Sequence, residues 1–105
     1  MNAAGPFDFE ERLEITGAAD VVSAHHRARE LSRLLGFSRR AQWEIAVAVS
    51  ECLGQVMAAF GGGKIALRCC FLGGGGFEFE AAGPDGLAAG DGPGYFGPRG
   101  DSLIR

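Results

Sequence analysis

The stretch that decides the fold is Ile45-Ala46-Val47-Ala48-Val49-Ser50-Glu51-Cys52-Leu53-Gly54-Gln55-Val56, the centre of an apolar run over residues 38–60. Apolar residues recur in it every three or four positions, which predicts one long helix. Because few polar residues interrupt the run, we expect this helix to be buried on two sides, between a sheet and another helix. Glu51 and Gln55 lie one turn apart on one face, where an acid and an amide can orient a water, a hydroxyl or a metal-bound phosphate.

A strand and a shorter helix are expected before this run. Residues 7–15 mostly alternate apolar and polar, with Glu11 as the exception, and this pattern predicts a half-buried strand. The first helix is expected to begin near Asp20, which can cap it, and to end at Gly36 as the C′ residue. Ser38 is expected to cap the long helix, and Gly61-Gly62-Gly63 ends it.

A hairpin and a glycine-rich tail are expected after the long helix. Residues 64–72 and 77–82 read as two strands around the turn at 73–76, with the glutamates of the second strand toward solvent. From Gly83 onward, glycine and proline predict a loop without a regular element. We therefore expect one domain core over 1–82 and a loop or lid remnant over 83–105. The expected fold is an α+β two-layer sandwich with the helices on one face of a mixed or antiparallel sheet.

Composition narrows the class of protein. The chain has 105 residues, of which 47% are hydrophobic and eight are Phe, enough for one folded domain. Its net charge of −3 argues against a nucleic-acid partner. We expect no membrane span and no secretory leader, and the three cysteines form no CxxC pair; together these features favour a cytoplasmic protein.

Positive charge is concentrated in the first helix. His25, His26, Arg27, Arg29 and Arg33 outnumber the single acid Glu30 within residues 25–40. Such a basic face can meet an acidic partner or can simply be solvated. The histidines can belong to the same surface, act as a pH sensor, or be ordinary polar positions of an amphipathic helix.

Several motifs resemble one known family. Asp20-Val21-Val22-Ser23-Ala24, Leu35-Gly36-Phe37-Ser38, the Ser50-Glu51 pair and Gly61-Gly62-Gly63-Lys64-Ile65 are similar to the RsbT-type anti-sigma switch kinases of the GHKL (Bergerat-fold) ATPases. The resemblance runs over residues 15–67 and more loosely to about residue 87. It implies a partial Bergerat fold, like that of the histidine-kinase ATPase domains.

The resemblance also implies roles for individual residues. Glu51 matches the family's general base, and Gln55 stands at the position of a Mg²⁺-binding Asn. The nucleotide loop corresponds to Gly83, Asp85 and Gly86. The chain departs from the family at three positions: Gln55 replaces Asn, Asp85 replaces the second loop glycine, and Ala81 replaces the Asp that binds adenine. The family's further helix and sheet have no counterpart before Arg105.

These observations favour a regulatory protein-binding module of the anti-sigma and switch-kinase type, with a degenerate site for ATP and Mg²⁺. Its partner would be a STAS-domain or sigma-like protein, contacted by His25, Arg27, Arg29 and Arg33. One alternative is an active serine kinase that phosphorylates a STAS-domain protein, with Glu51 as the base and Gln55 as a metal ligand. Another is a structural component that forms a homodimer over an open sheet edge.

Overall fold

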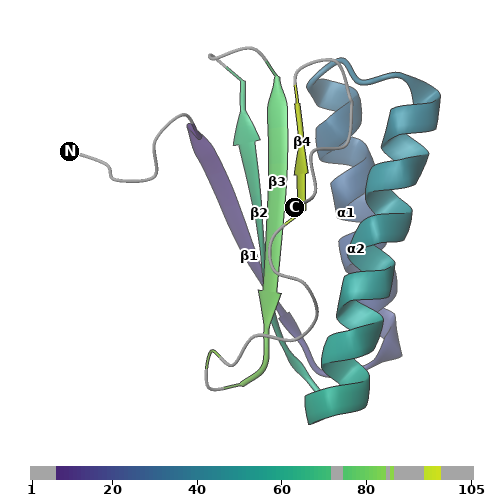
Figure 1. Ribbon diagram of the computed structural model, residues 1–105, viewed down its shortest axis with the longest axis vertical. Coiled ribbons are helices and arrows are strands. Elements are labelled where there is room, and N and C mark those ends of the chain that lie inside the picture. Colours follow the sequence, from purple (N-terminus) through teal and green to yellow (C-terminus); the bar gives the residue numbers. More distant parts are fainter. Residues whose placement is uncertain (1–6, 72–74, 85, 87–93, 98–105) are drawn as a thin grey trace.

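The chain folds into two layers, a sheet and a pair of helices. The computed structural model describes residues 7–71, 75–84, 86 and 94–97. In chain order the elements are β1 (Phe9–Ile15), α1 (Ala18–Leu34), α2 (Arg39–Phe60), β2 (Gly63–Cys70), β3 (Gly76–Ala82) and β4 (Gly94–Phe96). Figure 1 shows the sheet as one layer and both helices on one side of it. The expected α+β two-layer sandwich is therefore confirmed.

The sheet has the order β1-β2-β3-β4, and every neighbouring pair of strands is antiparallel. The inner face carries Leu67, Cys69, Phe77 and Phe79, all buried under the helices. The outer face carries charged residues, and Arg68 at its centre forms ion pairs with Glu10, Glu78 and Glu80. This alternation matches the sequence prediction, because successive side chains of a strand point to opposite faces.

The two helices lie side by side on the sheet. α1 contacts β1, whereas α2 contacts β2 and β3, and the two helices contact each other along their lengths. The expectation that α2 lies between the sheet and α1 was therefore wrong. Four strands about 4.8 Å apart are wide enough for two helices about 10 Å apart. One flank of α2 consequently stays exposed.

α2 combines a buried stripe with this open flank. Ile45, Val49 and Leu53 are fully buried and form the centre of the core. Within the described ranges, α2 is the one helix long and apolar enough to cross a membrane by composition. A core helix passes the same test, and the buried stripe of α2 is what packing on a sheet requires.

The ends of the helices follow the capping residues only in part. The Ala41 amide donates to Ser38 Oγ over 3.1 Å, and Gly36 and Gly61 both adopt left-handed backbone, so these three predictions are confirmed. α1 begins at Ala18 rather than near Asp20. Asp20 lies in the first turn and accepts hydrogen bonds from the Thr16 amide and hydroxyl, which fixes the strand-to-helix turn and lowers the Asp20 pKa.

The tail contributes a fourth strand that the sequence did not predict. β4 pairs with β3, and Phe96 lies opposite Phe77 in the core. Gly94 suits this strand because a side chain there would meet the Phe79 ring at 2.5 Å. Pairing with a distant strand therefore overrides the local glycine and proline signal.

The strand expected over 64–72 ends earlier than predicted, at Cys70.

Two glycines give a matched test of this packing. A Cβ at Gly63 would overlap Ala82 O and lie 2.8 Å from Val56 Cγ1, whereas a Cβ at Gly54 meets nothing within 4 Å. We predict that Gly63→Ala lowers the free energy of unfolding by about 1–3 kcal/mol. Gly54→Ala should raise it by about 0.5–1 kcal/mol, because Gly54 occupies a helix interior. Urea denaturation measures both, and equal effects of the two variants would contradict the packing described here.

Candidate functional site

Glu51 and Gln55 lie on the open flank of α2. Both side chains are exposed, one turn apart on the face opposite the buried stripe. Cys52 lies three residues before Gln55 and is half-buried, with its thiol against the backbone of Ala81 at the end of β3. Burial raises the pKa of this thiol. Cys52 thus lies between the buried stripe of α2 and the exposed flank that carries Gln55.

The turn after β3 is the second part of the predicted nucleotide site. The Gly86 amide donates to Gly83 O over 3.0 Å, and Gly86 adopts left-handed backbone. A Cβ at Gly83 would lie 2.6 Å from Phe60 Cδ2, so this glycine packs directly on the aromatic ring at the end of α2. Asp85 lies outside the described residues. The structure thus brings α2 and the turn after β3 together through Cys52 with Ala81 and Phe60 with Gly83, whereas Glu51 and Gln55 lie on the exposed flank of the helix.

The position of Ala81 limits what this region can recognise. Its side chain is 7% exposed and belongs to the core cluster. A methyl group there offers no hydrogen bond to a purine amino group. Within the described ranges, no three His, Cys, Asp or Glu side chains are grouped as metal ligands.

A second candidate site is a groove of about 200 Å³ on the outer surface, between the end of α1 and the start of α2. Its lining residues, which define the basic groove, are His26, Arg29, Glu30, Arg33 and Gln42. The tight joint at Gly36 and Phe37 places α2 beside α1, and the Gln42 side chain donates to Phe37 O over 2.9 Å. Arg29 and Arg33 are exposed, and in the described part of the chain neither forms an ion pair.

The four residues predicted to bind a partner lie in two different environments. Arg29 and Arg33 line the basic groove. Arg27 instead turns toward the sheet, where its Nε lies 2.7 Å from Glu11 Oε1. The hydrogen bond to Glu11 raises the pKa of the Arg27 guanidinium. His25 is half-buried between the helices, with Nδ1 at 2.9 Å from Ser50 Oγ and its ring edge-on to Trp43. His25 and Arg27 are thus engaged within the protein.

Exposed apolar side chains lie on the same helical layer as the basic groove. Trp43 is 56% exposed, and Val22 and Leu34 are each 54% exposed. The Trp43 ring lies edge-on to His25, which is one helical turn before Arg29, and Leu34 is one turn after the groove residue Glu30. The surface therefore combines uncompensated positive charge with large apolar groups. Sequence reasoning missed Gln42 as a lining residue, because only the joint between the helices brings it to the groove.

Comparisons with protein-family models, with curated proteins and with solved structures found no match to this chain.

Proposed function

We propose that this protein is a regulatory binding module that docks an acidic surface of a partner protein through the basic groove. The observation that carries the proposal is the groove itself, where Arg29 and Arg33 are exposed without ion-pair partners in the described structure. The sequence resemblance to anti-sigma switch kinases suggests a STAS-domain or sigma-like protein as the partner.

The composition of this surface is suited to protein recognition. Arg and Trp are enriched among residues that dominate binding energy at interfaces. Trp43 and Leu34 can lose exposed apolar area on docking, which favours association. Arg29 and Arg33 would steer an acidic partner toward the groove and fix its register.

The region around Ala81 and Gly83 supports binding without nucleotide turnover. The resemblance expects a carboxylate at position 81 to hold adenine, but the residue is an alanine buried in the core. The resemblance implies that the Gly83 backbone approaches the nucleotide. Here the Phe60 ring lies against Gly83 and covers its backbone on that side. Loss of such hydrogen bonds costs about 1–3 kcal/mol for each buried polar group left unpaired.

The test is binding of a STAS-domain protein and of a sigma factor from the same source, measured by calorimetry. We predict that one of them binds the full chain, and that Arg29→Ala and Arg33→Ala each weaken binding about tenfold. Affinity should fall with added salt, because the groove residues are exposed to screening ions.

Arg12→Ala provides the matched control, because Arg12 is an exposed arginine on the outer face of the sheet, away from the helices. It should leave binding unchanged. If neither protein binds, or if the two groove variants bind as tightly as the parent, the docking proposal is wrong.

An active serine kinase is the second candidate, and one observation favours it. Glu51 and Gln55 are both exposed one turn apart on the same flank of α2, so a base and an amide are available together. In this proposal Glu51 would accept the proton of the attacking serine, and Gln55 would bind Mg²⁺.

Calorimetric titration with ATP and Mg²⁺ separates the two candidates. For the binding module we predict no saturable binding up to about millimolar ATP, since Ala81 cannot hold the base. Micromolar ATP binding, with phosphoryl transfer to a STAS-domain protein that is lost in Glu51→Ala, would instead establish the kinase.

A further inference from the structure

A cleft at one end of the sandwich has no role in the proposed docking. It lies where α2 ends and β2 begins, and it has a volume of about 340 Å³. Its walls, which define the end cleft, are Glu14, Ile15, Thr16, Phe60, Gly61, Gly62, Gly63, Lys64 and Pro84. The basic groove lies at the first turn of α2 and the end cleft after its last, roughly 27 Å along the helix. The two sites are therefore separate.

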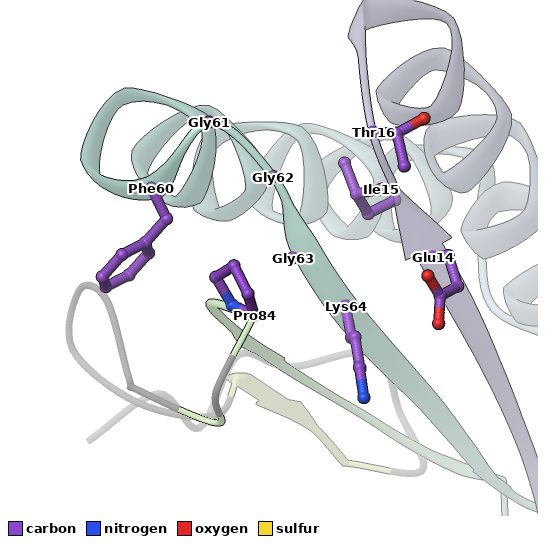
Figure 2. A pocket seen from close by; sticks show the side chains of 9 residues that line it. All are labelled: Glu14, Ile15, Thr16, Phe60, Gly61, Gly62, Gly63, Lys64 and Pro84. Atoms are coloured by element: carbon purple, nitrogen blue, oxygen red, sulfur yellow. The ribbon is translucent and has the colours of Figure 1, made fainter.

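Among the described residues, two opposite charges at the end cleft form no ion pair. Glu14 and Lys64 are directly opposite each other in the register of β1 and β2, and both are exposed. Neither forms an ion pair with any described residue, although every other charged side chain on the outer face of β1, β2 and β3 does. Figure 2 shows the two side chains next to each other on neighbouring strands. They are available to bind a ligand that carries both charges.

The carboxyl end of α2 adds to the preference for a cation. A helix C-terminus carries a partial negative charge, which a basic residue in the last turn often balances. α2 has no basic residue in its last turn, and it ends in Gly61 and Gly62, which have no side chains to cover that end. The end of α2 and Glu14 both contribute negative potential to the end cleft, which favours a positively charged group.

The opposite wall of the end cleft is apolar. Phe60 and Pro84 lie across Gly63 from Glu14 and Lys64 in Figure 2. Phe60 is held in place by its contact with Gly83. A pocket of this size with an apolar wall and a few charged groups is typical of a site for a small molecule.

We propose that the end cleft binds a small zwitterion, a free amino acid with an apolar side chain. Its ammonium group pairs with Glu14, and its carboxylate pairs with Lys64. Its side chain packs on Phe60 and Pro84. Each group of the ligand thus meets a group of the cleft that carries the opposite charge or is apolar.

NMR titration of the ¹⁵N-labelled full chain tests this proposal. The probes are L-leucine, L-methionine and L-phenylalanine, and we expect saturable shifts of the Gly61, Gly62 and Gly63 amide signals. N-acetyl-L-phenylalanine lacks the cation and L-phenylalaninamide lacks the carboxylate, so each should bind about tenfold more weakly than L-phenylalanine. Glu14→Ala and Lys64→Ala should weaken binding of L-phenylalanine by a similar factor.

Arg12→Ala is the matched control, because Arg12 lies on the same strand and face as Glu14 but does not line the end cleft. It should bind L-phenylalanine like the parent, and the spectra themselves report whether each variant is folded. The proposal is overturned if none of the three amino acids shifts the glycine signals, or if the capped compounds bind as well as L-phenylalanine. Neither result bears on docking at the basic groove.

Discussion

The ion pair between Arg27 and Glu11 joins α1 to the sheet. Arg27 Nε lies 2.7 Å from Glu11 Oε1, and both side chains are about two-thirds buried, with 34% and 29% exposed. In the described structure it is the one ion pair that joins the helical layer to the sheet. Successive helical residues are 100° apart, so fixing Arg27 toward the sheet turns His26, Arg29 and Arg33 to the far side. The basic groove follows from this orientation.

Apolar burial and the ion pair have different effects. The core formed by Leu31, Ile45, Leu53 and Phe77 supplies most of the stabilisation, because burial of apolar area is the dominant favourable term in folding. The buried stripe of Ala24, Ala28 and Leu31 decides which face of α1 meets the core, and the ion pair adds a polar contact that favours the same rotation. Glu11 points to the inner face of the sheet, where a carboxylate without a partner would be costly. Arg27 therefore stabilises one rotation of α1 over the others.

Much of the fold could be predicted from the sequence, because its signals are local. The alternation in β1, the apolar stripe of α2, the Ser38 cap and the glycines after each helix all depend on residues a few positions apart. Features that depend on distant pairs were missed. β4 forms because residues near 95 pair with β3, and α2 lies beside α1 because the sheet is wide enough for both.

The candidate sites show the same division. Glu51 and Gln55 could be placed on one helix face from their spacing, and Arg29 and Arg33 could be assigned to a basic face. In the sequence, Glu11 differs from its neighbours only as a polar exception in the strand pattern, and Arg27 is one of several cations in the first helix. Their sequence separation gives no sign that each is the other's partner. The end cleft is likewise formed by three segments that meet only in the folded chain.

A double-mutant cycle between Glu11 and Arg27 tests most directly whether their contact helps to hold α1 on the sheet. Glu11→Gln, Arg27→Met and the double variant would be compared with the parent by urea denaturation. The account predicts a coupling energy of about 1 kcal/mol, so that the double variant loses less stability than the two single variants together. Strictly additive losses would mean that the two side chains do not interact, and would contradict the account of how α1 is positioned.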